Sequence, residues 1–171
     1  IELGLVGSEM CIRDRIVCSH NTPENKLDRA ISSLVSQDYE NFQIIVVDDC
    51  SSKPVTLSVR DHRVRLYRTS TNYGPYICRN HAIRNYAKGK YITFVDSDDW
   101  CEPGYLSSLY SEHTNSGCIV SYAKHVRHFP SGKKEKSKLI HHATSFYERS
   151  LHEKIGYFDS VRFAADWEFR K

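Results

Sequence analysis

Short apolar runs, each bounded by polar or turn-forming residues, are spaced along the first part of the chain. Residues 43–47 and 91–95 are continuous β-branched and aromatic runs, which are typical of parallel strands buried on both faces. Residues 64–68 alternate between apolar and polar side chains and predict a weaker strand. Ile16 and Val17 form the short apolar part of a further strand near the start.

Amphipathic segments lie between these runs. Thr22 offers a hydroxyl cap and Pro23 a first helical residue, which together are a start signal for a helix. The apolar face of that helix repeats at helical spacing in Leu27, Ala30, Ile31, Leu34 and Val35. A second helix is predicted over 76–88, because Gly89 is typical of the position just beyond a helix end. A third helix is predicted after 102–104.

The pattern changes after Cys118. Residues 119–129 and 139–146 are expected to form an antiparallel pair around a turn at 130–134. The lysine-rich run 133–136 is expected to lie on the solvated tip of that hairpin. Strands that alternate with helices and end in such an addition indicate an α/β domain. We expect a mainly parallel sheet with helices on both faces and a late antiparallel hairpin.

The two ends of the sequence are unusual. Residue 1 is Ile, the single methionine is Met10, and residues 1–15 resemble a translated sequencing adapter. We therefore expect 1–15 to be a non-native leader and 16–171 to be the domain, truncated in its C-terminal part. If the leader is foreign, its charged side chains are expected outside the sheet or inserted into apolar surroundings.

Composition excludes several classes of protein. The chain has 171 residues, of which 40% are hydrophobic, and this excludes a disordered chain. The formal net charge of +3 is too small to indicate nucleic acid as a partner. No apolar run approaches the ~20 residues that cross a bilayer. The six cysteines are scattered without a Cys-x-x-Cys motif, so we expect a reducing compartment and a cytoplasmic protein, free or peripheral at the membrane.

Carboxylates follow two of the predicted strands. The run 43–47 ends in a pair of acids and the run 91–95 in a cluster of three: Asp48, Asp49, Asp96, Asp98 and Asp99. Ligands of open α/β sheets bind outside the carboxyl ends of the strands. Like charges this close repel one another unless a cation is present, and Mg²⁺ and Mn²⁺ prefer such oxygen ligands. The pattern predicts a metal–diphosphate site, with turn and helix-cap roles as the ordinary alternative for either cluster alone.

Five segments of the chain carry a resemblance to a known family: 16–21, 45–51, 72–74, 79–80 and 94–99. In order and spacing they resemble glycosyltransferase family 2, and residues 155–169 are similar to the acceptor-side end of its domains. The resemblance implies the GT-A fold and metal-dependent transfer of a sugar from a nucleotide-sugar to a hydroxyl acceptor, with inversion. It further implies UDP as the nucleotide and Mn²⁺ or Mg²⁺ as the cofactor. The donor sugar and the acceptor, whether saccharide, lipid-linked or protein, stay open.

The resemblance also implies roles for residues around the nucleotide. Ser19 and Asn21 match the loop that lines the nucleoside pocket. Asp49, the second acid of its pair, matches the acid that accepts a hydrogen bond from the base. Asn72 and Arg79 fall where the family approaches the nucleotide.

The later acids match the reaction centre of the family. Asp96 would hold the ribose hydroxyls and Asp98 the metal that bridges the diphosphate, while Asp99 caps the next helix or joins them. Asp166 matches the general base, with Glu168 as the alternative base and helix capping as the ordinary role of Asp166.

Three other functions are weighed against this one. A nucleotidyltransferase usually has a glycine-rich phosphate loop after its first strand, and residues 19–23 contain no glycine. A receiver domain needs a late strand ending in lysine, which nothing after Asp99 supplies. A catalytically inactive domain that binds a nucleotide-sugar is the third alternative, and Mn²⁺-dependent stabilisation by UDP separates these readings.

Overall fold

The computed structural model describes residues 13–137 and 142–159. Within them, six strands form one sheet in the order β3-β2-β1-β4-β8-β5, and two strands form a separate ribbon. The strands are β1 (Arg13–Ser19), β2 (Phe42–Asp48), β3 (Val64–Arg68), β4 (Tyr91–Phe94), β5 (Val120–Tyr122), β6 (Val126–His128), β7 (Lys134–Lys136) and β8 (Ser145–Glu148). The helices are α1 (Glu24–Val35), α2 (Pro75–Asn85), α3 (Tyr105–Ser116), the 3-10 helix η1 (His142–Thr144) and α4 (Leu151–Ile155).

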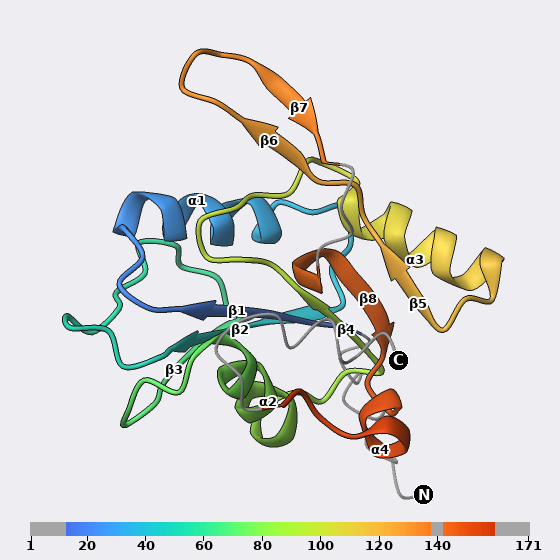
Figure 1. The fold of residues 1–171 in the computed structure, drawn as a ribbon, viewed down its shortest axis with the longest axis horizontal. Helices are drawn as coiled ribbons and strands as arrows, with labels where there is room; N and C mark the ends of the chain where they lie inside the picture. Colours follow the sequence, from blue (N-terminus) through green and yellow to red (C-terminus); the bar gives the residue numbers. More distant parts are fainter. Residues whose placement is uncertain (1–12, 138–141, 160–171) are drawn as a thin grey trace, which may run out of the picture.

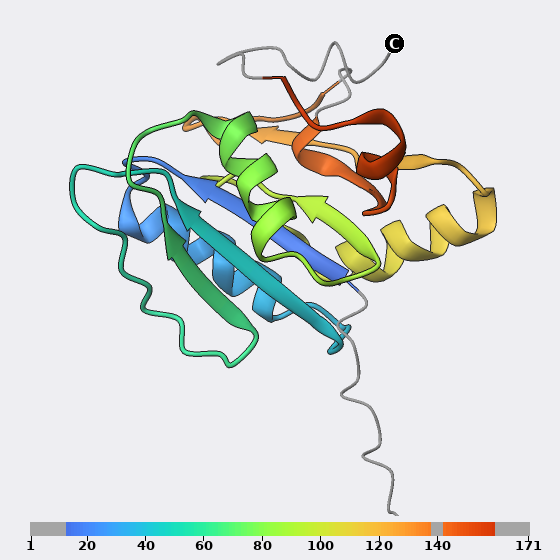
Figure 2. The same ribbon diagram turned by 90° about the horizontal axis from the view of Figure 1, so that it is seen from below.

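The sheet is mainly parallel. β3, β2, β1 and β4 run in one direction, while β8 pairs antiparallel with β4 and β5 antiparallel with β8. α1 and α3 lie on one face of the sheet, and α2 and α4 on the other (Figures 1 and 2). The β6–β7 ribbon stands above α1, away from the sheet (Figure 1). The predicted fold class is therefore confirmed.

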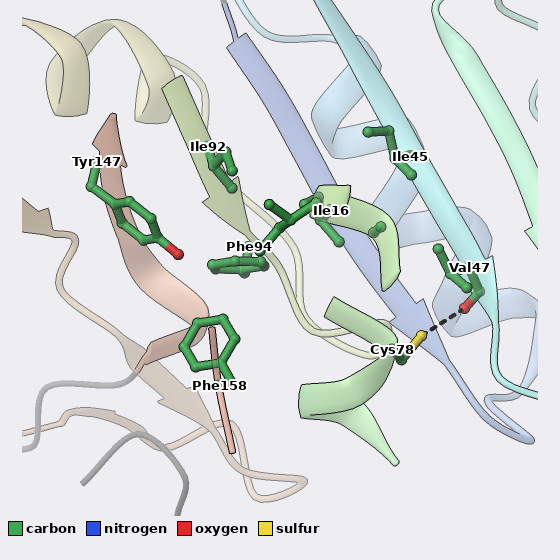
Figure 3. Close-up of a cluster of buried hydrophobic side chains, with 10 residues drawn as sticks. Ile16, Ile45, Val47, Cys78, Ile92, Phe94, Tyr147 and Phe158 are labelled. Atoms are coloured by element: carbon green, nitrogen blue, oxygen red, sulfur yellow. Dashed lines mark hydrogen bonds between the residues drawn. The ribbon is translucent and has the colours of Figure 1, made fainter. Parts of the chain in front are cut away.

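Successive side chains of the central strands point alternately into two separate hydrophobic cores, one on each face of the sheet. On β2, Ile44 and Val46 pack with Leu27 and Ile31 of α1. The intervening Ile45 and Val47 point to the opposite face and pack against Cys78 of α2. The buried cluster on that face contains Ile16, Ile45, Val47, Cys78, Ile92, Phe94, Tyr147 and Phe158 (Figure 3). Successive side chains of a strand point to opposite faces, so a strand covered on both sides is apolar throughout.

The late part of the chain differs from the single long hairpin that the sequence predicts. Only residues 126–136 form the hairpin, as β6 and β7, while β5 and β8 join the main sheet. Phe146 and Tyr147 explain the position of β8, because each is fully buried in a different core cluster. Only a strand covered on both faces can bury two adjacent rings in this way.

The start of α1 corrects a second expectation. The helix begins at Glu24 with Pro23 in the cap position, and no side chain caps it. Thr22, predicted as the cap, instead places its hydroxyl 2.7 Å from the hydroxyl of Ser97. This contact joins the loop after β1 to the loop after β4, at the end of the sheet where the acids lie. α2 ends at Asn85, three residues before its predicted end at 88.

The central strand β1 begins at Arg13, three residues before the expected start of the domain at residue 16. Its first three residues, Arg13, Asp14 and Arg15, are charged. Asp14 accepts hydrogen bonds from Gln43 Nε2 (2.8 Å) and from the Gly89 amide (2.7 Å). Arg13 and Arg15 are also buried, yet two nitrogens of each guanidinium group have no partner in the described part of the chain. Burial lowers the pKa of Arg15 to about 9. Arginines thus lie in largely apolar surroundings, and the foreign origin of 1–15 stays a prediction.

Candidate active site

A cavity of about 400 Å³ lies at the C-terminal ends of β1, β2 and β4. Of the six residues predicted to bind the donor, it brings together five, which are Ser19, Asp49, Asn72, Arg79 and Asp96. They come from four separate stretches of the chain, and the parallel strands place those stretches at one edge of the sheet. This edge is where open α/β sheets bind their ligands.

Ser19 is a buried polar residue on the cavity wall. It ends β1, it is 1% exposed, and it lines the cavity. Its hydroxyl oxygen has no hydrogen-bond partner among the described residues. A buried hydroxyl without a partner is unfavourable, so the cavity offers a place for a polar ligand atom beside Ser19.

The two acids after β2 have different roles. Asp48 is tied into its own loop, where its carboxylate accepts from the amides of Ser51 (2.9 Å) and Val55 (3.1 Å) and pairs with Arg68. Burial alone would raise the pKa of Asp48, but these hydrogen bonds and Arg68 outweigh it and hold the pKa below its usual value. Asp48 therefore shapes the loop and does not line the cavity.

Asp49 lines the cavity and is held by the segment that follows the neighbouring strand β3. Its Oδ1 accepts from the Thr69 hydroxyl (3.1 Å) and the Tyr73 amide (3.0 Å), and its Oδ2 accepts from the Gly74 amide (2.8 Å). A carboxylate has about four lone-pair positions. One position on Oδ2 is therefore left for a donor in the cavity, such as a base N–H.

Gly74 makes this arrangement possible. Its backbone has φ 85° and ψ 164°, a region open essentially to glycine alone. The Gly74 amide donates to Asp49 Oδ2 and also to the Asn72 side-chain oxygen, at 3.1 Å, and Pro75 then starts α2. The roles of the Tyr73 and Gly74 amides were not predicted, although glycine before proline at a helix start is a sequence signal for such a turn.

Asn21 does not line the cavity. It has a positive φ of 53°, and its Oδ1 accepts from both the amide (2.9 Å) and the hydroxyl (2.8 Å) of Ser52. It thereby ties the loop after β1 to the loop after β2. The neighbouring His20 does line the cavity, with Nδ1 at 2.8 Å from the Asp49 carbonyl oxygen. Because a carbonyl only accepts, this contact assigns the proton to Nδ1.

Arg79 and Asp96 form an ion pair on the cavity wall, with 2.9 Å between Arg79 Nη2 and Asp96 Oδ1. The Arg79 side chain is 8% exposed and the Asp96 side chain 49% exposed. The guanidinium group also lies near the rings of Tyr76 and Phe94. Asp96 is thus held through Oδ1, and it remains half-exposed on the cavity wall.

The three acids after β4 point to three different partners. Asp96 pairs with Arg79, Asp98 lies 3.8 Å from Lys26 of α1, and Asp99 lies 3.9 Å from His125. No group of three metal-binding side chains occurs within 13–137 and 142–159. Asp98 is the most exposed of the three, at 58%, and its hard oxygens suit Mg²⁺ or Mn²⁺, which take one or two carboxylates plus substrate phosphates. The donor chemistry fits such an ion, but the protein side chains alone do not form its site.

The predicted base and its alternative, Asp166 and Glu168, lie outside the described residues. Their roles stay predictions. Among the parts that are described, the helices lack the length and the hydropathy that spanning a membrane requires.

Comparison with known proteins now decides the family. The sequence model of Glycosyl transferase family 2 matches residues 15–166. The chain belongs to glycosyltransferase family 2. Glycosyltransferase GlyA of Streptococcus pneumoniae is 30% identical over 146 residues, which is 81% of this chain and 20% of GlyA. The putative colanic acid biosynthesis glycosyl transferase WcaA of Escherichia coli is 29% identical over 150 residues, 84% of this chain and 53% of WcaA.

Solved structures agree on the fold of this family 2 domain. S. aureus TarS 1-349 in complex with UDP superimposes with a TM-score of 0.74 at 23% identity, covering 92% of this chain and 53% of that one. The same protein in complex with UDP-GlcNAc gives a TM-score of 0.71 at 22% identity, covering 90% and 50%. The fold is therefore the GT-A fold. The chain spans between a fifth and about half of the length of these relatives.

Proposed function

We propose that this chain binds the nucleotide of a UDP-sugar and transfers the sugar to a hydroxyl acceptor. One observation carries the proposal, namely that a single cavity at the strand ends brings Ser19, Asp49, Arg79 and Asp96 together. Membership of family 2 makes sugar transfer the class of reaction. The titles of the TarS structures name UDP and UDP-GlcNAc for that protein, which supports a uridine nucleotide here.

Each side chain has a task that its contacts support. The free position on Asp49 Oδ2 would accept the N–H of the base, and the unpaired Ser19 hydroxyl would bond the nucleoside. Asp96, held by Arg79, would accept the ribose hydroxyls through its other oxygen. Asp166 would take the proton of the acceptor hydroxyl, a contribution of about 10²–10⁴-fold. Attack from the side opposite the diphosphate gives a single displacement with inversion.

A divalent ion completes the proposal, with Asp98 as its protein ligand. Mn²⁺ or Mg²⁺ would neutralise the charge that the diphosphate gains as it leaves. Because the described residues hold no cluster of three ligands, we expect the nucleotide to supply part of the binding site. Lys26 lies 3.8 Å from Asp98 and is the group that the ion would compete with.

Metal and nucleotide are therefore expected to stabilise the protein only together. Mn²⁺ alone should leave the melting temperature unchanged, UDP alone should raise it slightly, and the two together should raise it by several degrees, since a ligand at about 100 times its Kd contributes ~2.7 kcal/mol. Thermal unfolding followed by fluorescence measures this. Asp98→Asn should lose the metal-dependent part, and Asp99→Asn, whose acid faces His125, should keep it. A full response to Mn²⁺ without nucleotide would contradict the shared site.

Turnover of UDP-sugars tests the function itself. A panel of UDP-sugars is incubated with the protein, and release of UDP is measured with and without Asp166→Asn. We expect slow metal-dependent release from one sugar and about 10²–10⁴-fold less in the variant. Release of pyrophosphate from a nucleoside triphosphate and a sugar phosphate, with no UDP release, would favour a nucleotidyltransferase. Binding of UDP-sugar with no release by either protein would favour an inactive binding domain.

A further inference from the structure

A second cavity, of about 540 Å³, borders the first. It lies between the loop that joins β4 to α3 and the β6–β7 ribbon, and Asp96 lines both cavities. A molecule in the second cavity is therefore next to Asp96, the residue proposed to hold the ribose of the donor. Figure 1 shows the β6–β7 ribbon standing above α1 and the loop that follows β4.

The ribbon turns one basic face toward this cavity. Lys134 and Lys136 are two apart on β7, and side chains two apart lie on the same face of a strand. Their cross-strand partners are His128 and Val126, and all four residues line the cavity. Lys124, just before β6, lines it as well. The alternation places Arg127 and Glu135 on the other face of the ribbon.

Lys124, Lys134 and Lys136 have no carboxylate partner within ion-pair distance in the described ranges. The neighbouring Lys133 behaves differently, because it pairs with Glu135 at 3.6 Å and does not line the cavity. Three ammonium groups around one hollow repel each other. An anion bound between them would remove this repulsion.

An aromatic side chain, Trp100, lines the cavity beside the ribbon. Trp100 lies between Arg29, whose guanidinium group is 3.9 Å from the Trp100 ring centre, and His128, whose ring centre is 4.8 Å away. Trp100 is thus held in place with its indole on the cavity wall. Three acids, Asp96, Asp99 and Glu102, also line this cavity, and Asp96 lies at its border with the donor cavity. Carboxylates accept hydrogen bonds from hydroxyl groups, whereas lysines bind negative charge.

We propose that this second cavity binds an anionic saccharide acceptor, with its phosphate or carboxylate group on Lys124, Lys134 and Lys136 and its hydroxyls toward Asp96. The acceptor role rests on the proposed transferase function. The charge asymmetry of the cavity sets the orientation of the acceptor, because its charged group is kept at the ribbon and its hydroxyl edge is turned toward the donor cavity.

Three sugars of similar size and different charge test the proposal: glucose 6-phosphate, glucuronate and glucose. Each is titrated into the isotope-labelled chain, and amide chemical shifts are followed by NMR. We expect the two charged sugars to shift the amides of Lys124, Lys134 and Lys136, with glucose at least about tenfold weaker. The variant Lys124→Gln/Lys134→Gln/Lys136→Gln should bind the charged sugars about tenfold more weakly, as expected for the loss of three exposed ion pairs.

A charge-matched control, Lys53→Gln/Lys88→Gln/Lys133→Gln, removes three lysines outside the cavity and should bind as the wild type does. Equal binding of glucose, or equal loss in the control, would overturn the proposal. UDP titrated into the same proteins separates the two ideas. Charged sugars that bind without UDP binding overturn the transferase and leave an anionic-sugar site, whereas UDP binding without a preference for charged sugars overturns the acceptor proposal alone.

Discussion

Replacing Arg15 by methionine is expected to stabilise the fold by about 1–4 kcal/mol, the range seen when buried charges give way to apolar side chains of similar volume. The Arg15 guanidinium group is fully buried on Phe42, 3.3 Å from the ring centre, and donates only to the Leu34 carbonyl (3.1 Å). Its Nε and Nη2 have no partner among the described residues. Methionine keeps the contact with Phe42 and removes the cost of burying the charge.

Arg63→Met is the matched control for this substitution. Arg63 lies over the same Phe42 ring, at 4.3 Å, but it is paired with Asp61 at 2.8 Å. Its removal leaves Asp61 without its partner, so the control should lower the free energy of unfolding. Urea denaturation of both variants measures the difference. If Arg15→Met destabilises the fold as much as Arg63→Met, burying the Arg15 guanidinium group does not carry the net cost inferred here.

Asp49→Asn is expected to weaken UDP binding about 10–100-fold, because hydrogen bonds to a charged group contribute ~1.5–3 kcal/mol. The carboxylate holds the Tyr73 and Gly74 amides and keeps one position for the base. An amide nitrogen at Oδ2 would face the Gly74 N–H, donor against donor, and could not accept from the base. Calorimetric titration with UDP measures the loss.

Thr69→Val is the control for Asp49→Asn. It removes the 3.1 Å hydrogen bond to Asp49 Oδ1 but keeps the charge and both backbone bonds. UDP affinity should then change by no more than a few fold. An Asp49→Asn variant that binds UDP as the wild type does would mean that the base lies elsewhere.

The central sheet was predictable from the sequence because burial on both faces leaves a clear pattern. β3 has the predicted bounds, and β2 differs from its predicted run by one residue at each end. The late strands were not predictable in the same way. β8 pairs with β4, more than fifty positions earlier, and no local pattern distinguishes that pairing from a hairpin with the preceding strand.

The sequence predicted which residues line the donor cavity better than it predicted which partners their side chains contact. Parallel strand ends gather at one edge, which brought Ser19, Asp49 and Asp96 into one cavity. The direction of Asp98 depends on Lys26 of α1, a contact between distant segments. The run 133–136 is exposed, as predicted for a solvated hairpin tip, and two of its lysines also line a cavity, which the sequence did not predict.

The location of bound UDP tests the central claim most directly. UDP is added to the isotope-labelled chain in the presence of Mg²⁺, which does not broaden NMR signals, and the amide of Gly74, which donates to Asp49 at 2.8 Å, is the reporter. We predict that the largest chemical-shift changes fall on Ser19, Tyr73 and Gly74, with small changes on the β6–β7 ribbon. Changes confined to the ribbon, or none at the strand ends, would contradict a nucleotide site in this cavity.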